Sequence, residues 1–357
     1  MIPIVLPDKA QVEAAHLDAL SRGVYDKFND LEEYVKNSKD YTEDVLNDIK
    51  MYLRVLSDAS LCRILVMDVS AQRDLVASID KIFPPGRFYG KEERSVERNR
   101  AFADVNNRLL KVFDYDAFAR MKGKWGLLAL ALCLNKAVKV CPYCNGEYVF
   151  AFKLDKGDFS GKVKGRKSPF DHYFPRTRYP FLGLSLYNLI PCCSRCNSLM
   201  KRDMYDGLLN MPHPYEADVT KSVYKGMKFR VIASKPKAFY SCSIEDIDSV
   251  LLTERENGTF SVGRCWERLF KITDVYSNIY HGRVADAMSK SVGYTASYFE
   301  ELRGKLVETG LPVGDVERLV YGASLRWQDI NRMPFAKMTI DIHDTYAGHC
   351  GLNATEL

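Results

Sequence analysis

The sequence contains no apolar run long enough to cross a membrane. Its most apolar stretch, WGLLALALCLNKAV at 125–138, is shorter than the roughly 20 residues that a membrane helix needs, so it predicts a buried helix. The first twenty residues lack a basic segment followed by a long apolar core, and no export signal is therefore expected. Both absences favour a cytoplasmic protein that does not contact a membrane.

Internal repeats, low-complexity tracts and a nucleotide-binding glycine loop are also missing. The nearest approach to such a loop, GKVKGRKS at 161–168, is one residue short and has an arginine inserted. A zinc deaminase is excluded because no His-x-Glu precedes the segment PCCSRC at 191–196. The chain thus has no ATP-binding motif of its own, and its cysteines need another explanation.

The length and the hydrophobic patterns predict three regions. A chain of 357 residues is enough for two or three domains, and 46% apolar residues is ordinary for a globular protein. Residues 1–138 have apolar side chains at three- and four-residue spacing, which predicts helices. Alternating patterns in 139–215 predict strands, and 216–357 is expected to be mainly helical after one or two strands. The predicted fold class is α+β, mostly helical around a small central core.

Four of the ten cysteines form two Cys-x-x-Cys pairs, Cys141 with Cys144 and Cys193 with Cys196. Disulfides are rare in long chains without an export signal, so metal binding or burial is the better explanation. Two such pairs can hold one tetrahedral zinc ion, and a long insertion between them adds little loop-closure cost. Cys192 competes for the third position, but the two-residue spacing from Cys193 is the commoner one.

Two alternatives remain open for these four cysteines: they are reduced core residues without a metal, or they include a redox pair. The cysteines that lie outside the pairs and their vicinity are predicted to be small buried hydrophobic residues. They are Cys62, Cys133, Cys242, Cys265 and Cys350.

Several polar residues lie between and beside the cysteine pairs, where apolar packing does not explain them. They are Asp171, His172, Asn188, Asn197 and Lys201. A histidine with a pKa near ~6.5 is mostly neutral at pH 7 and can accept a proton from water. Carboxylate and amide oxygens suit Mg²⁺. Each residue alone is more often a surface pair, a turn residue or a solvated charge, but together they favour metal-dependent phosphodiester hydrolysis.

Residues 139–215 resemble the HNH (ββα-metal) endonucleases that carry a four-cysteine zinc site. The resemblance rests on the order Cys141-Pro-Tyr-Cys144, Asp171-His172, Asn188, Cys193-Ser-Arg-Cys196-Asn197 and Lys201. It implies two strands and a helix held by structural zinc. It also implies that His172 is the general base, that Asp171 and Asn197 bind a catalytic Mg²⁺ or Mn²⁺ ion, and that Asn188 orients the His172 ring and its loop. Asn197 replaces a final histidine, so the preferred ion is left open.

Positive charge is concentrated in the same region. Residues 141–202 contain eleven Lys or Arg and four Asp or Glu, a net charge of +7, whereas the whole chain has +5. This distribution favours nucleic acid as the substrate, and the family resemblance implies DNA. The residues expected to contact it are Lys167, Arg176, Arg178 and Lys201; the alternative for GKVKGRK is a solvated hairpin loop.

The motifs are also similar to those of PtuB-type nuclease subunits of Septu anti-phage systems, together with the aromatic-rich segment CWERLFKITDVYSNIYHGRV at 265–284. That similarity implies a bacterial defence role and an ATPase partner that controls cutting, docked on the helical regions. A competing function is a non-catalytic zinc module that binds nucleic acid or protein, for which Asp171, His172 and Asn188 would not be needed together. A third is an interaction scaffold without any divalent ion.

Overall fold

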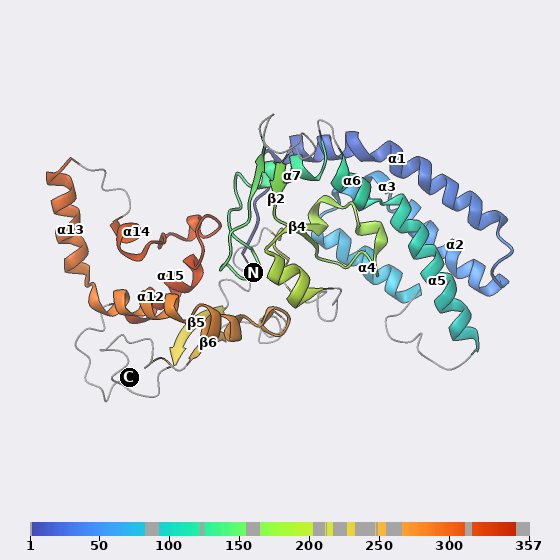
Figure 1. Cartoon of the computed structure of the whole chain (residues 1–357). Coiled ribbons are helices and arrows are strands. Elements are labelled where there is room, and N and C mark those ends of the chain that lie inside the picture. The colour runs from blue at the N-terminus through green and yellow to red at the C-terminus, as the bar shows by residue number, and fades with distance from the viewer. Residues whose placement is uncertain are drawn as a thin grey trace.

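The computed structural model describes residues 2–82, 93–121, 125–154, 165–202, 211, 213–216, 227–232, 247, 249–254, 266–310 and 316–347. The described part is mostly helical with small antiparallel two-stranded sheets, as the α+β prediction requires. In Figure 1 the N-terminal helices lie at one end, the C-terminal helices at the other, and the residues around the cysteine pairs between them. None of the described helices is long and apolar enough to cross a membrane.

The N-terminal region is helical, as its apolar spacing predicts. Its helices are α1 (Lys9–Asn37), α2 (Glu43–Asp58), α3 (Leu61–Val66), α4 (Val69–Ile82), α5 (Glu93–Val112), α6 (Tyr115–Arg120) and α7 (Leu127–Leu134). From Val12 to Val35, α1 buries a residue at every third or fourth position, which is the period of one helix face. The apolar run at 125–138 forms α7, whose Leu127, Leu130, Ala131 and Leu134 are buried.

The central region contains two short hairpins and a helix. Strand β1 (Ala151–Lys153) pairs with β2 (Gly165–Lys167), and β3 (Phe170–His172) pairs with β4 (Leu189–Pro191), both antiparallel. The loop from β3 to β4 includes the 3₁₀ turns η2 (Pro180–Leu182) and η3 (Leu186–Asn188). After β4 comes η4 (Arg195–Lys201), which has π-helical geometry. The Asp-His pair and the second cysteine pair therefore lie in a strand, strand, helix succession.

The C-terminal region begins with a hairpin and continues in helices, as predicted. Strand β5 (Met227–Ile232) pairs with β6 (Ser249–Glu254). The later elements are α11 (Ile272–Asp274), η7 (Val275–Ile279), α12 (His281–Gly293), α13 (Ala296–Glu308), α14 (Val316–Tyr321), η8 (Trp327–Asp329) and α15 (Ala336–Tyr346). Helix α15 lies on β5, where the Asp341 carboxylate accepts a hydrogen bond from the Phe229 amide at 2.9 Å.

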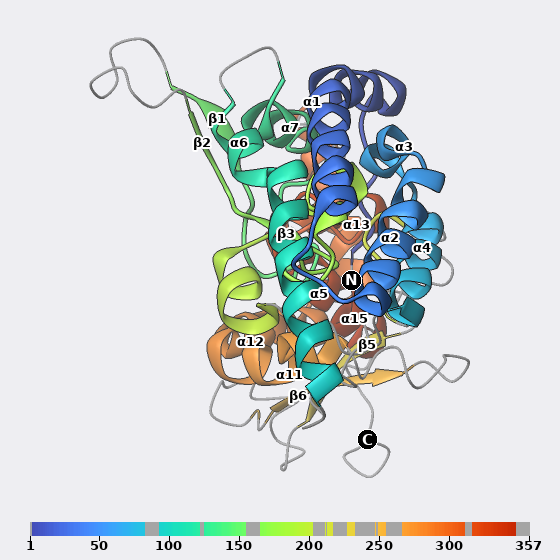
Figure 2. The same ribbon diagram turned by 90° about the vertical axis from the view of Figure 1, so that its right-hand side faces the viewer.

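One hydrophobic cluster runs from α1 through the cysteine pairs to α15. The N-terminal helices contribute more than apolar packing, because they also bond to the loop between β3 and β4. The Gln72 amide donates to the Ser185 hydroxyl at 3.0 Å, and Arg178 forms an ion pair with Asp80 at 3.1 Å. In Figure 2 the helices α1 to α5 lie on the side of the molecule that faces the viewer. These bonds hold the loop between β3 and β4 against the N-terminal helices.

His16 also bonds to this loop and is completely buried. Its Nε2 bonds to the Leu184 carbonyl at 2.7 Å, and its Nδ1 accepts a hydrogen bond from the Trp125 indole at 3.2 Å. A carbonyl can only accept, so Nε2 carries the proton and the ring is neutral. Burial lowers the pKa of His16 from 6.5 to about 4, and the bond to Leu184 only partly opposes this effect.

This burial predicts a loss of stability in mild acid. Between pH 6.5 and pH 4 the unfolded chain protonates His16 while the folded chain does not, so the free energy of unfolding falls as the pH is lowered. The loss from this group is about 3 kcal/mol. Urea unfolding at pH 7 and pH 4.5 should show a smaller pH effect for His16→Gln than for the wild type. The same substitution at His343, a half-buried residue of α15, serves as the matched control, and equal pH effects in all three proteins would contradict the assignment.

Candidate metal centre and catalytic cluster

The thiol sulfurs of Cys141, Cys144, Cys193 and Cys196 all lie within 4.8 Å of one another and are buried. The sulfurs of Cys144 and Cys193 are 3.9 Å apart. A tetrahedral zinc ion with bonds of about 2.3 Å places its sulfur ligands about 3.8 Å apart, whereas a disulfide would need about 2.05 Å. The four free thiols therefore have the arrangement of a four-cysteine metal centre, and zinc fits it.

Each cysteine pair lies in a turn that directs backbone N–H groups at sulfur. The Gly146 amide donates to the sulfur of Cys144 at 3.4 Å, and the Cys196 amide donates to Cys193 at 3.4 Å. Asn145, directly after the first pair, has a positive φ of 53°, a conformation that asparagine adopts more readily than most residues. Such N–H bonds stabilise the negative thiolate, which is the form that binds metal.

The choice of Cys193 over Cys192 agrees with this cluster. Burial raises the pKa of Cys192 well above its usual range, so it stays a neutral thiol beside Asp171. The sulfur of Cys193, and not that of Cys192, belongs to the group of four that lie within 4.8 Å of one another.

The prediction for the scattered cysteines was wrong at Cys62, which is exposed because it lies on the outer face of the short helix α3. Cys133 is half-buried at the edge of the hydrophobic core. The predictions for Cys242, Cys265 and Cys350 lie outside the described residues.

Residues far along the chain hold the first cysteine pair, a role that the sequence did not predict for them. The Trp266 indole donates to the Tyr143 carbonyl at 2.9 Å, and the Tyr276 hydroxyl donates to the Cys144 carbonyl at 2.8 Å. The Asn145 side chain accepts a bond from the Lys337 amide at 2.9 Å. The available signal was the aromatic-rich segment at 265–284, whose tryptophan and tyrosines supply two of these donors.

The two neighbouring cysteines allow a matched test of the metal centre. Cys193→Ser should abolish stoichiometric zinc binding and lower the melting temperature, because structural zinc contributes on the order of 10 kcal/mol to folding in small sites. Cys192→Ser should keep one zinc per chain. Zinc content by mass spectrometry and thermal unfolding measure both effects. Equal zinc content in the two variants would contradict the assignment.

Asp171 is buried and its carboxylate is fully engaged. One oxygen accepts a bond from the Lys201 ammonium at 3.0 Å, and the other accepts a bond from the Tyr143 hydroxyl at 2.6 Å. Lys201 has no exposed side-chain surface and also donates to the His172 carbonyl at 2.7 Å. Tyr143, which stands between the first two cysteines, was not predicted to contact this carboxylate. The pair of Asp171 and Lys201 is therefore a buried ion pair that also fixes the backbone of β3.

His172 follows Asp171 on β3 and is half-buried. Its Nε2 lies 2.9 Å from the Gly183 carbonyl, which makes Nε2 the protonated nitrogen and Nδ1 the acceptor. In the part of the chain that the structure describes, nothing bonds to Nδ1. The ring makes an edge contact with Tyr115, at 4.5 Å between centroids. Burial lowers the pKa of His172 to about 3, and the charges of Arg176 and Lys201 act in the same direction, so the imidazole is neutral at pH 7 but weakly basic.

Asn188 is completely buried and fastens the loop that carries Gly183. Its side-chain oxygen accepts a bond from the Phe174 amide at 2.7 Å. Its amide nitrogen donates to the carbonyls of Phe174 and Leu182, both at 3.0 Å. The contact with Leu182 holds the residue next to Gly183, and Gly183 in turn holds the His172 ring. These contacts have the form expected for a residue that orients the histidine and its loop; a catalytic effect of Asn188 stays a prediction.

The remaining site residues lie further out. Asn197 is half-buried in the first turn of η4, where its carbonyl accepts a bond from the Arg202 amide at 3.1 Å, the five-residue spacing of a π-helix. Lys167 lies over the Phe170 ring at 5.5 Å. Arg176 pairs with Asp116 at 3.4 Å. Lys201 is buried, and Arg178 is paired with Asp80. Lys167 and Arg176 are therefore the more exposed of the four residues predicted to contact nucleic acid.

A second, catalytic cation would have to use oxygen donors. Among the described residues, the cysteine cluster is the one group of three or more His, Cys, Asp or Glu side chains close enough to share an ion. Asp171 and Asn197 offer a carboxylate and an amide, which suits Mg²⁺ or Mn²⁺ because such ions keep most of their water ligands. Asp171 already neutralises Lys201, so its carboxylate would have to share its negative charge between the ammonium group and the ion.

The ion pair predicts a large cost for removing its cation. Lys201→Met leaves Asp171 buried without a counter-charge, and the free energy of unfolding should fall by about 3 to 5 kcal/mol. The surface pair of Lys305 with Glu301 gives a matched control, because both side chains are mostly exposed at 66% and 63%. Lys305→Met should leave stability unchanged within error. Urea unfolding that gives similar values for the two variants would show that Lys201 is not buried on Asp171.

Three comparisons with known proteins gave no match: no family model, no curated protein and no solved structure matches this chain.

Proposed function

We propose that this protein is a metal-dependent endonuclease of the HNH type, which hydrolyses phosphodiester bonds in nucleic acid, most simply DNA. The observation that carries the proposal is the placement of the Asp171-His172 pair on a two-stranded hairpin beside a four-cysteine cluster. Asn188 fastens the loop of that hairpin and so orients His172. A structural zinc site would need the cysteines but not this arrangement of polar residues.

Under this proposal His172 acts as the general base. Its Nε2 is fixed by the Gly183 carbonyl, so the lone pair of Nδ1 can accept a proton from the attacking water. Asp171 and Asn197 would hold the Mg²⁺ or Mn²⁺ ion, which would supply positive charge for the phosphate and the departing oxygen. Lys201 neutralises Asp171 and fixes the backbone of His172, and so sets the position of both residues.

The finer proposal, drawn from the sequence resemblance, is that the nuclease belongs to a bacterial anti-phage system and is controlled by an ATPase partner. The chain has no nucleotide-binding loop of its own, which accords with control by a partner. The competing proposal is a non-catalytic zinc module. It accounts for the cysteine cluster, but it gives no reason for the buried Asn188 that braces the His172 loop.

The decisive experiment is cutting of supercoiled plasmid by the purified chain with Mg²⁺ or Mn²⁺. The wild type should nick the plasmid, and His172→Ala should lower the rate by a factor of about 10² to 10⁴, the usual contribution of a general base. His343→Ala, at a half-buried histidine of α15 outside the proposed site, should cut like the wild type. Zinc content must match in all three proteins.

Cutting that survives in His172→Ala would sink the proposed mechanism. If the folded, zinc-loaded wild type neither cuts alone nor with its co-purified partners, the binding module is the correct function. Cutting that appears only with the partners would support the controlled nuclease.

A further inference from the structure

An aromatic face on the β1–β2 hairpin and the residues just before it lies outside the metal centre and the Asp171-His172 cluster. Tyr148, Phe150 and Phe152 follow one another at every second position and are 62%, 47% and 45% exposed. Val149 and Ala151, which alternate with them, are buried. Hairpins with one solvated face normally place polar residues there, so three outward aromatic rings in succession indicate a surface that binds something.

The hidden side of the hairpin explains why these rings cannot simply turn inward. Val149 and Ala151 belong to the hydrophobic core to which α7 contributes. The approach is close, because a Cβ atom at Gly165 would lie 2.4 Å from the Phe152 carbonyl oxygen and 2.9 Å from the Leu128 side chain. A one-residue shift in register would bury the aromatic rings but expose the core side. The packing against α7 therefore fixes the aromatic side outward.

The charge around this face is positive. Arg166 lies directly opposite Phe152 in the strand pairing and is exposed, so it shares the aromatic side. The acidic residue of the described hairpin is Glu147, and it is already engaged by the Tyr280 hydroxyl at 2.8 Å and by Arg195 at 3.6 Å. An anionic ligand with flat apolar surfaces would match both features.

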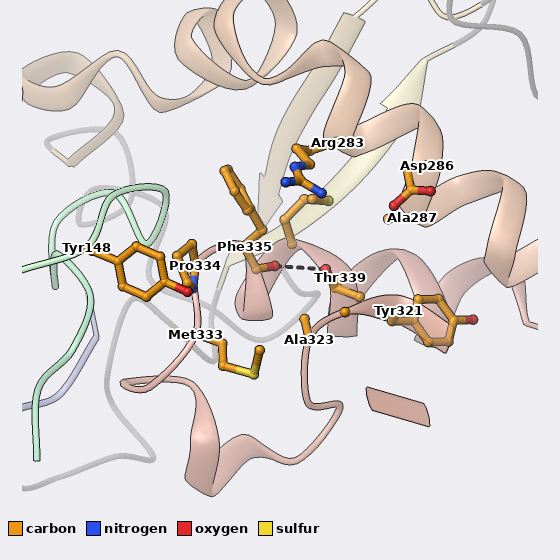
Figure 3. Close-up of a pocket in the computed structure, with 12 residues that line it drawn as sticks. Tyr148, Arg283, Asp286, Ala287, Tyr321, Ala323, Met333, Pro334, Phe335 and Thr339 are labelled. Atoms are coloured by element: carbon orange, nitrogen blue, oxygen red, sulfur yellow. Dashed lines mark hydrogen bonds between the residues drawn. The ribbon is translucent and has the colours of Figure 1, made fainter. Parts of the chain in front are cut away.

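The aromatic face continues into a pocket between the hairpin and the C-terminal helices. Tyr148 lines this pocket together with Phe335 and Arg283 (Figure 3). The Arg283 guanidinium lies 5.8 Å from the centre of the Phe335 ring. In the described part of the chain no carboxylate pairs with Arg283, because its neighbour Asp286 is bonded to Lys290 at 2.9 Å. A cation thus lies at the end of the aromatic row.

We propose that Tyr148, Phe150 and Phe152, flanked by Arg166 and Arg283, form a binding track for single-stranded nucleic acid. The Phe150 and Phe152 rings stack on each other with their centroids 5.7 Å apart, and the exposed outer faces of this aromatic row give unpaired bases a surface for stacking. A duplex hides the faces of its bases, so it cannot use such a track. The inference rests on the proposed function for its choice of polymer. Only two residues separate β2 from β3, so the track is directly connected to the Asp171-His172 strand.

The test is equilibrium binding, measured without added divalent ion on the full chain carrying His172→Ala. Fluorescence anisotropy of a labelled 20-nucleotide oligothymidine is compared with that of a 20-base-pair duplex. Adding Phe150→Ala and Phe152→Ala together should weaken single-strand binding at least ~10-fold, because stacking of one base on an aromatic ring is usually worth that much. Duplex binding should change little.

Further variants separate stacking, charge and misfolding. Phe152→Tyr keeps an aromatic ring, so its affinity for oligothymidine should match that of the parent protein. Tyr25→Ala, at an exposed aromatic residue of α1, should also leave this affinity unchanged. Arg283→Gln should reduce the slope of log affinity against log salt by about 0.7, the value for one phosphate contact on a single strand. Circular dichroism and zinc content verify the fold of each variant.

Unchanged single-strand affinity in the folded double variant would overturn the inference, as would equal losses for single strand and duplex. Loss of a co-purifying protein with oligothymidine affinity intact would identify a protein-docking face instead and would also overturn it. The plasmid assay remains a separate readout. If the wild type cuts plasmid but the double variant binds oligothymidine as tightly as its parent, the track is refuted and the nuclease is not. If oligothymidine binding depends on the track but no plasmid is cut, the nuclease is refuted and the track is not.

Discussion

The four-cysteine cluster is the constraint on which the site depends. Cys141 and Cys144 lie before both central hairpins, and Cys193 and Cys196 lie after them, so the cluster joins the two ends of the segment that contains Asp171, His172 and Asn188. Strands of three residues cannot hold such a segment by backbone bonds alone. A bound zinc ion would supply the missing stability locally, and it would do so where the positions of β3 and β4 are set.

The N-terminal and C-terminal helical regions also fix the position of the site, each through its own hydrogen bonds. N-terminal residues such as His16 and Gln72 bond to the loop that carries Gly183, while C-terminal residues such as Trp266 and Tyr276 bond to the first cysteine turn. The position of the His172 ring therefore depends on the N-terminal helices, and the position of the metal ligands depends on the C-terminal ones. This division explains why the hydrophobic core is continuous from α1 to α15 although the sequence pattern suggests three regions.

The parts of this arrangement that the sequence predicted are those encoded by spacing. Apolar periodicity located the helices, and the Cys-x-x-Cys spacing selected Cys193 over Cys192. The spacing of residues in the sequence does not determine which side chains are buried, because burial depends on packing between residues far apart in the chain. Lys201 was expected to contact nucleic acid, but its side chain is buried on Asp171, and Tyr143 donates a second hydrogen bond to that carboxylate that no sequence pattern predicts. The exposure of Cys62 was missed for the same reason, since a six-residue helix has too few turns to show which face is covered.

The buried pair of Asp171 and Lys201 links stability to the proposed chemistry. A lone buried carboxylate is costly, so Asp171 needs a cation whether or not a substrate is present, and Lys201 meets that need. A divalent ion at the same carboxylate would be repelled by the ammonium group, which weakens ion binding to the protein alone. A phosphate group brings negative charge to the same place and removes part of that repulsion. Under the proposed function, ion and nucleic acid should therefore bind cooperatively, and the protein without nucleic acid would hold the catalytic ion weakly.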